Sequence, residues 1–162
     1  MTLTRTSQSG AIILYLVEQY DKEGRISYDS LPEKYLTWQL LMFQVSGQGP
    51  YFGQATWFAR FHPEKIQSAT DRYVNEIDRV MGVLDIALKD RDWLVGDKCT
   101  YADLSFVTWA EVGKGLLAQL NKLDILDKYP NHNRWMAAMN QREVVKKVHE
   151  RVAAGRKAAG LP

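Results

Sequence analysis

The fold is decided by the stretch Trp93-Leu94-Val95-Gly96-Asp97-Lys98-Cys99-Thr100-Tyr101-Ala102-Asp103-Leu104, which joins an apolar run, a Gly-Asp turn and a helix-start signal without a gap. Thr100 stands where an N-cap is needed, and Asp103, at the third helical position, can accept the backbone N–H of the cap. The run from Leu104 to Val112 is apolar on nearly every face, which is typical of a helix surrounded by other helices. We therefore expect a central buried helix that begins after Thr100.

Apolar residues recur at helical spacing on both sides of this central helix, and no strand-like alternation of useful length occurs in the sequence. The predicted fold class is therefore an all-α bundle. A loop is expected near Asn121 to Asp127. Six other helices are predicted. The first runs from Gln8 to about Glu23, the second opens near Pro32 and carries Tyr35 to Val45, and the third runs from Tyr51 to Phe61. The fourth is opened by Pro63 and carries Ile66 to Leu88, the fifth is short and opened by Pro130, and the last carries Val144 to Val152.

The second predicted helix meets Gly47, Gly49 and Pro50. Proline cannot donate a backbone hydrogen bond, and its ring clashes with the preceding helical turn. We therefore expect a kink or a break at Pro50, after which the chain resumes a helical course.

Length and composition favour one soluble domain from a reducing compartment. A chain of 162 residues can bury a sizeable core, and its single cysteine excludes an internal disulfide. The longest apolar run, Ala11 to Val17, has seven residues, against the roughly 20 that a membrane-spanning helix needs. We expect a cytoplasmic protein with no membrane segment.

The net charge of +2 is too small to imply nucleic-acid binding. Residues 142–157 hold six Lys or Arg against two acids, so the excess of positive charge is local. A solvated helical face is the ordinary interpretation of this basic segment, and an acidic partner or RNA is the alternative.

Beyond these patterns, Trp93-Leu94 with Gly96-Asp97, followed by the box Thr100-Tyr101-Ala102-Asp103, resembles the central helix start in the C-terminal domain of glutathione transferases. Phe43 to Pro50, Gly53-Gln54 and Arg60 to Lys65 are similar to the fungal branch that includes the yeast nitrogen-regulator and prion protein. The resemblance runs from about Ser7 to Val148. It implies a glutathione transferase C-terminal-domain-like helical bundle over residues 25–162, with residues 1–24 as the last helix of a thioredoxin-like domain.

The resemblance implies a glutathione S-transferase-like function in which this chain contributes the hydrophobic co-substrate site. It places the group that activates the glutathione thiol in the thioredoxin-like domain, so we expect no catalytic residue here and no competence of this chain alone. The implied ligands are glutathione and a small electrophile, with a homodimer or another protein as partner. Two alternatives stay open: a non-catalytic protein-interaction or assembly module of the same fold and, ranked last, a regulator that holds a transcription factor.

Gln8 and Ser9 are the candidate remnant of the glutathione site, because they match the Glu-Ser pair of the family at the start of this helix. A hydroxyl and free N–H groups at a helix N-terminus suit a carboxylate, here the γ-glutamyl one. Gln8 departs from the family pattern and lacks the charge that pairs with the γ-glutamyl amine. The alternative is that Ser7 and Ser9 merely cap a helix.

The candidate co-substrate wall lies around the expected kink, where glycines open space and glutamine amides are placed to orient an apolar ligand. The alternative is that the Gly-Pro segment only bends a long helix, with the aromatic side chains as core. Arg60, which can bind an anionic group or serve as a structural hydrogen-bond donor, is added to the wall. The wall residues are Phe43, Gln44, Gly47, Gln48, Tyr51, Phe52, Gln54 and Arg60.

Cys99, at a helix start, can in principle be a reactive thiol, but its position before the cap favours a small buried apolar residue. His62, His132 and His149 are scattered, without cysteine or carboxylate partners at ligand spacing. We therefore expect no metal site.

Overall fold

The computed structural model describes residues 7–160, and within this range the chain is helical with no strand, which confirms the all-α fold class. Residues 1–6 and 161–162, which belong to the two predicted domain segments, lie outside the described part. The elements are α1 (Ser9–Tyr20), α2 (Leu31–Phe43), the π-helical turn η1 (Gln44–Gln48), α3 (Gly49–Thr56), the π-helical turn η2 (Trp57–Phe61), α4 (Gln67–Ala87), α5 (Tyr101–Gln119), α6 (Asp124–Asp127), α7 (Pro130–Gln141) and α8 (Glu143–Ala158).

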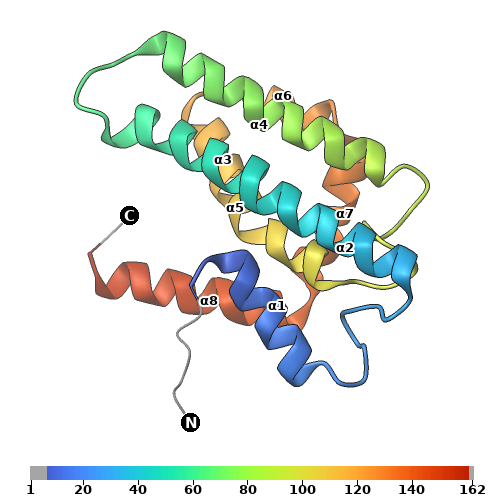
Figure 1. Cartoon of the computed structure of the whole chain (residues 1–162). Coiled ribbons are helices and arrows are strands. Elements are labelled where there is room, and N and C mark those ends of the chain that lie inside the picture. The colour runs from blue at the N-terminus through green and yellow to red at the C-terminus, as the bar shows by residue number, and fades with distance from the viewer. Residues whose placement is uncertain (1–6, 161–162) are drawn as a thin grey trace.

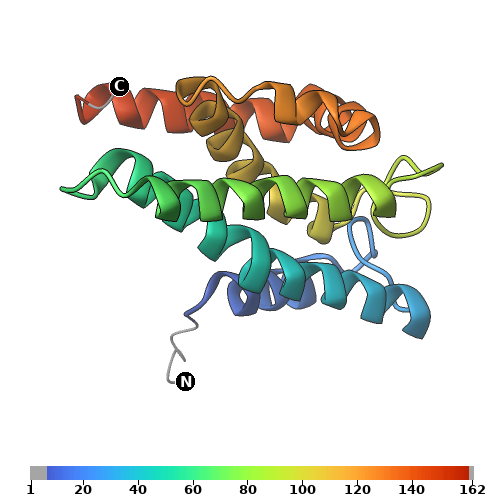
Figure 2. The ribbon, with the colours of Figure 1, turned by 90° about the horizontal axis from the view of Figure 1, so that it is seen from above.

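The helices form a bundle in which α5 passes through the middle (Figure 1). It contacts α2, α3 and α7, while α4 packs along α3 on one side and against α7 on the other. Figure 2 shows α1 and α8 on opposite sides of the molecule. The core between these layers is apolar and includes the fully buried side chains of Leu41, Ile77, Leu84, Phe106, Leu116 and Trp135.

The helix that begins at Leu31 is not broken at Pro50, so the prediction of a break at this proline is wrong. Residues 31–61 stay helical throughout, because η1 widens the helix just before the proline. Its closing bond runs from the Gly49 N–H to the Gln44 carbonyl, five residues back. Pro50, which has no N–H to donate, follows this wider turn, and the wider turn accommodates it within the continuous helix.

Two other boundaries differ from the prediction. Pro63 does not open the next helix: His62, before it, is extended with ψ 132°, as residues before proline tend to be, and α4 starts at Gln67. The expected loop near Asn121 contains the single turn α6, around the buried side chain of Ile125. One turn is too short to give a periodic signal.

The predicted capping box is present at the start of α5. The Asp103 carboxylate accepts the Thr100 N–H at 2.8 Å and the Thr100 hydroxyl at 2.9 Å. Its other oxygen accepts the Leu94 N–H and the indole N–H of Trp135, both at 3.0 Å. Asp103 is fully buried, so one carboxylate ties the apolar run, the helix start and α7 together.

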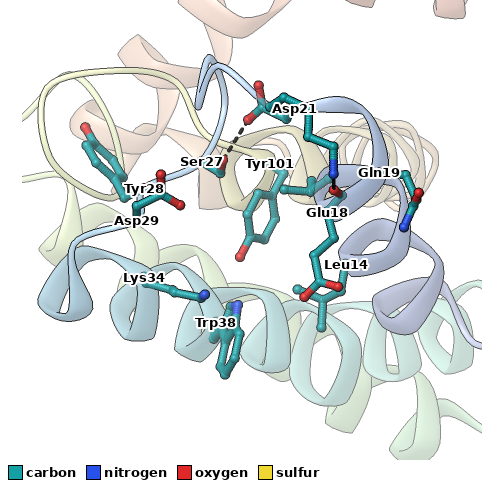
Figure 3. Close-up of a pocket in the computed structure, with 12 residues that line it drawn as sticks. Leu14, Glu18, Gln19, Asp21, Ser27, Tyr28, Asp29, Lys34, Trp38 and Tyr101 are labelled. Atoms are coloured by element: carbon teal, nitrogen blue, oxygen red, sulfur yellow. Dashed lines mark hydrogen bonds between the residues drawn. The ribbon is translucent and has the colours of Figure 1, made fainter.

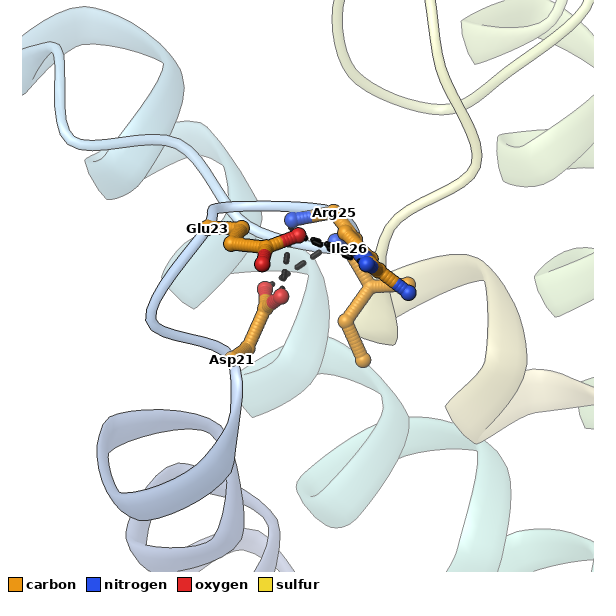
Figure 4. Close-up of polar contacts among 4 residues, drawn as sticks. All are labelled: Asp21, Glu23, Arg25 and Ile26. Carbon is orange, nitrogen blue, oxygen red and sulfur yellow. Dashed lines mark hydrogen bonds and ion pairs between the residues drawn. The ribbon is translucent and has the colours of Figure 1, made fainter.

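The connection from α1 to α2 is held by a second carboxylate (Figure 4). Asp21, after the last turn of α1, accepts the N–H groups of Arg25 and Ile26 at 2.7 and 3.0 Å and the Ser27 hydroxyl at 2.7 Å. Burial acts to raise the pKa of Asp21, but these hydrogen bonds outweigh it and lower the pKa below its ordinary value. The Ile26 carbonyl accepts the Tyr101 N–H at 2.9 Å, which fixes the connection against the start of α5.

Candidate functional site

The amino end of α1 carries the predicted glutathione remnant. Gln8, just before the helix, has φ 75° and ψ 124°, and its carbonyl accepts the Ile12 N–H at 3.0 Å. Such a backbone conformation costs about 1–3 kcal/mol in a residue other than glycine and is found preferentially at ligand sites. Among residues 7–160 no side chain caps this helix end. Its first N–H groups and the exposed Ser9 are therefore available to an anion.

This helix end lies directly against the end of α2. Gly10, the one buried residue of α1, faces Val45 and Met42: a Cβ at Gly10 would lie 3.1 Å from Val45 Cγ2 and 3.9 Å from Met42 Cε. The absence of a side chain at Gly10 is what lets the two helices approach so closely. The structure thus places Gly10, next to Ser9, against Met42 and Val45, which flank Phe43 and Gln44 at the start of the predicted co-substrate wall.

Gln44 and Gln48, which we expected to orient a ligand, are turned into the bundle instead. Both are buried; Gln44 Nε2 donates to Gln48 Oε1 at 3.2 Å, and Gln48 Nε2 donates to the Phe106 carbonyl on α5 at 3.1 Å. A buried amide needs such partners because leaving it unpaired is costly. These two amides join the π-helical turn to α5 and are not presented to a co-substrate in this structure.

The rest of the predicted wall is divided between the core and the surface. Phe52 is buried over Gly113, where a Cβ would lie 2.7 Å from its ring, so it belongs to the core. Tyr51 is half-buried with its ring 6.3 Å from that of Tyr73, and Gln54 is exposed. Phe52 is therefore a core residue of a long helix, as the alternative predicts. Gln44 and Gln48 are buried in the same bundle.

Phe43 and Gly47, near the start of the predicted wall, pack against each other. The half-buried Phe43 packs on Gly47, where a Cβ would lie 3.1 Å from the ring, and its ring centroid is 6.2 Å from that of Phe106. Arg60, farther along, donates through Nε to Gln119 Oε1 at 2.7 Å. It thereby links η2 to the end of α5, which is the structural role that the sequence offered as one alternative.

A cleft that the sequence patterns do not indicate, with a volume of about 420 Å³, lies between α1, the α1–α2 connection and α2 (Figure 3). Trp38 and Lys34 enter it from α2, with the Lys34 ammonium 5.5 Å from the Trp38 ring centre. Tyr101 lies behind them, and burial raises its pKa to about 12, so the phenol stays protonated. These residues are far apart in sequence, and the turn around Asp21 that assembles them has no recognisable motif.

Cys99 is a buried core thiol that lies 3.8 Å from Met139 Sδ. Burial, with the nearby Asp103 charge, raises the pKa of Cys99 to about 12, and the thiolate is the reactive form. We expect a thiol reagent such as dithionitrobenzoate to leave the folded chain unmodified near neutral pH and to modify one thiol per chain in denaturant. Fast modification of the folded chain, as judged by absorbance, would contradict this assignment.

Neither a metal cluster nor a membrane helix is found among the described residues. Residues 7–160 contain no group of three His, Cys, Asp or Glu side chains placed to hold a metal ion. Within the same range no helix has the length and apolar character needed to cross a bilayer. His62 accepts the Glu64 N–H at 3.1 Å and stacks on Phe58, whereas His132 lies in a separate pocket between α5 and α7.

Residues 49–143 match the family model described as Glutathione S-transferase, C-terminal domain. The chain is 43% identical to the Glutathione S-transferase-like protein gedE of Aspergillus terreus over 151 residues, which cover 87% of this chain and 66% of that protein. It is 43% identical to Glutathione S-transferase 2 of Schizosaccharomyces pombe over 156 residues, or 90% of this chain and 67% of the relative. The chain thus spans about two thirds of the length of these relatives.

Solved structures give the same result. Ure2p5 from Phanerochaete chrysosporium, cocrystallized with 1-(S-glutathionyl)-2,4-dinitrobenzene, superposes with a TM-score of 0.87 at 40% identity, covering 93% of this chain and 70% of that one. Ure2p in complex with glutathione superposes with a TM-score of 0.78 at 38% identity, covering 88% and 68%. The resemblance drawn from the sequence, including its fungal branch, is confirmed.

Proposed function

The chain belongs to the glutathione S-transferase family through its C-terminal domain, and from this premise we propose that it supplies the helical part of a glutathione-conjugating enzyme. In the reaction, the glutathione thiolate forms a bond to an electrophilic carbon, and the leaving group departs with its bonding electrons. The thiol proton goes to solvent beforehand. The group that stabilises the thiolate belongs, on this proposal, to a thioredoxin-like domain, so the chain alone binds ligand without turnover.

One observation carries the proposal: the strained Gln8 and an α1 end that no side chain of residues 7–160 caps adjoin Gly10, which lies against Met42 and Val45. The γ-glutamyl carboxylate would accept hydrogen bonds from Ser9 and from the first N–H groups of α1, where the helix dipole favours negative charge. The electrophile would then lie along the exposed Met42 and the half-buried Phe43. A charged group and an apolar group of one ligand are thus accommodated within one region.

The names of the relatives favour this function over a free-standing assembly module. The same family also leads us to propose that the protein acts in the cytosol. Glutathione keeps thiols reduced there, which is compatible with the free Cys99. The apolar character of Met42 and Phe43 favours an apolar electrophile.

A variant at Ser9 tests the proposed site. Because a hydrogen bond to a charged group contributes about 1.5–3 kcal/mol, Ser9→Ala is expected to weaken binding of S-hexylglutathione by about tenfold or more. Ser68→Ala is the matched control, because Ser68 is also an exposed serine in the first turn of a helix, α4. Binding is measured by nuclear magnetic resonance, in which amide signals of residues 9–11 and methyl signals of Met42 and Val45 should shift together. Equal affinities of the two variants, or shifts elsewhere only, would refute the assignment.

A second prediction concerns the surface of α1. Ile12, Tyr15, Leu16 and Tyr20 are exposed, Tyr20 to 76%, and apolar patches of this kind tend to become covered by a partner. We expect the chain to self-associate in sedimentation velocity at high concentration. Leu16→Glu should shift it toward monomer, while Val83→Glu, at an exposed valine of α4, should not. A wild-type chain that sediments as a clean monomer throughout would contradict this expectation.

A further inference from the structure

The cleft between α1 and α2 (Figure 3) has no part in the proposed function. Its volume is about 420 Å³, and its lining comes from α1, the α1–α2 connection, α2 and Tyr101 at the start of α5. Ser9, Met42 and Phe43, which we assign to glutathione and to the electrophile, do not line it. A ligand in this cleft would therefore bind independently of the proposed function.

Several polar groups of the cleft wall already have partners within the protein. The Asp21 carboxylate accepts three hydrogen bonds from the α1–α2 connection, one of them from the Ser27 hydroxyl at 2.7 Å, which Figure 3 draws. The Lys22 ammonium donates to a backbone carbonyl in the last turn of α1. The Tyr28 hydroxyl donates to the Asp97 carboxylate at 2.8 Å. These bonds hold the walls of the cleft in place, and they make these groups less available to a ligand.

Three other charged side chains line the cleft without an ion pair. Glu18 on α1, Asp29 in the connection and Lys34 on α2 form no ion pair with another residue of the range 7–160. The Lys34 ammonium lies instead 5.5 Å from the centre of the Trp38 ring. Figure 3 shows Glu18 reaching from α1 toward α2, where Lys34 and Trp38 lie. Opposite charges that face a cleft without pairing with each other suit a ligand that carries both signs of charge.

The uncharged part of the lining is apolar and aromatic. Leu14 and Val17 contribute to it from α1, Trp38 from α2 and Tyr101 from α5. Trp38 is half-buried, so part of its indole is open to a ligand. A volume of about 420 Å³ lies in the range of roughly 300–1,000 Å³ that small-molecule sites occupy, and such sites combine apolar walls with a few charged groups. Aromatic walls favour an aromatic group in the ligand.

We propose that this cleft binds a short zwitterionic peptide that carries an aromatic side chain. The peptide carboxylate would lie near the Lys34 ammonium on α2, the peptide ammonium would lie near the Glu18 carboxylate on α1, and the aromatic ring would lie against Trp38. Asp29 adds a second acid to the lining. Two acids against one cation disfavour a ligand with a net negative charge.

The test is a nuclear magnetic resonance titration of the isotope-labelled chain with the dipeptide glycylphenylalanine. The indole N–H signal of Trp38 and amide signals of residues 14–19 and 27–34 are expected to shift saturably. The N-acetylated dipeptide lacks the ammonium, and the C-terminal amide lacks the carboxylate. Each is expected to bind about three- to fivefold more weakly, the loss that follows from removing one solvent-accessible charge pair. A Trp38 signal that does not respond to the dipeptide would overturn the proposal.

Two variants assign each ligand charge to its wall. In Lys34→Met, which keeps an apolar side chain beside Trp38, the dipeptide and its C-terminal amide should bind equally well. In Glu18→Gln, the dipeptide and its N-acetylated form should bind equally well. Lys146→Met and Glu150→Gln, at exposed residues of α8 outside the cleft, make the same changes in net charge and should keep the wild-type differences. Thermal melting checks that all four variants are folded.

Such a double-mutant comparison separates a direct charge contact from a general change in the field of the protein. The proposal is overturned if the C-terminal amide loses as much affinity for Lys34→Met as for the wild type. It is equally overturned if N-acetylation costs as much affinity in Glu18→Gln as in the wild type.

Discussion

Asp103→Ala is expected to destabilise the folded chain by about 3–5 kcal/mol, because it removes a buried carboxylate from several donors at once. The donors are the N–H groups of Leu94 and Thr100, the Thr100 hydroxyl and the Trp135 indole. Each would be left buried without an acceptor. Urea unfolding at constant pH gives the change directly, as a lower midpoint with an unchanged slope.

Asp97→Ala is the matched control for this prediction. Asp97 belongs to the same stretch and also accepts a hydrogen bond, from the Tyr28 hydroxyl at 2.8 Å, but it is exposed. Its removal is expected to cost less than about 1 kcal/mol, as for other surface interactions. If Asp103→Ala and Asp97→Ala unfolded at the same urea concentration, the start of α5 would not be the anchor that we describe.

Gly113→Ala and Gly115→Ala are expected to change stability in opposite directions, although both lie on α5. A Cβ at Gly113 would lie 2.7 Å from Phe52 Cε1 and 2.9 Å from its Cδ1, and Phe52 is buried. The ring must therefore shift within a packed core, at a cost of about 1–3 kcal/mol. A Cβ at Gly115 meets no atom within 4 Å, so that variant should gain up to about 1 kcal/mol from helix propensity.

Comparing the two alanine variants isolates packing, because the propensity gain is common to both. Differential scanning calorimetry should give a melting temperature below that of the wild type for Gly113→Ala and above it for Gly115→Ala. A stabilised Gly113→Ala variant would mean that α3 and α5 are not in the close contact described here.

Much of the bundle was predictable because the signals were local. The capping box at Thr100 depends on residues three positions apart, and the periodicity from Ile66 to Leu88 lies within one helix. Pro130 does open α7, as expected. Such features need no knowledge of what packs against them.

The candidate site was less predictable because its geometry depends on contacts between distant segments. Gln44 and Gln48 point inward because the Phe106 carbonyl, on another helix, offers a partner. The turn η1 replaces a break because one wider turn removes the conflict at Pro50. The approach of α1 to α2 depends on Gly10, for which the sequence alone names no neighbour.

The most direct test of the central claim is a calorimetric titration of the chain with glutathione and S-hexylglutathione, beside a chlorodinitrobenzene conjugation assay on the same sample. We expect both ligands to bind at one site, S-hexylglutathione more tightly because its alkyl chain adds apolar contact with Met42 and Phe43, and no conjugation above the uncatalysed rate. A cooperatively melting chain that binds neither ligand would contradict the proposed role of the α1 end. Turnover would contradict the assignment of thiol activation to another domain.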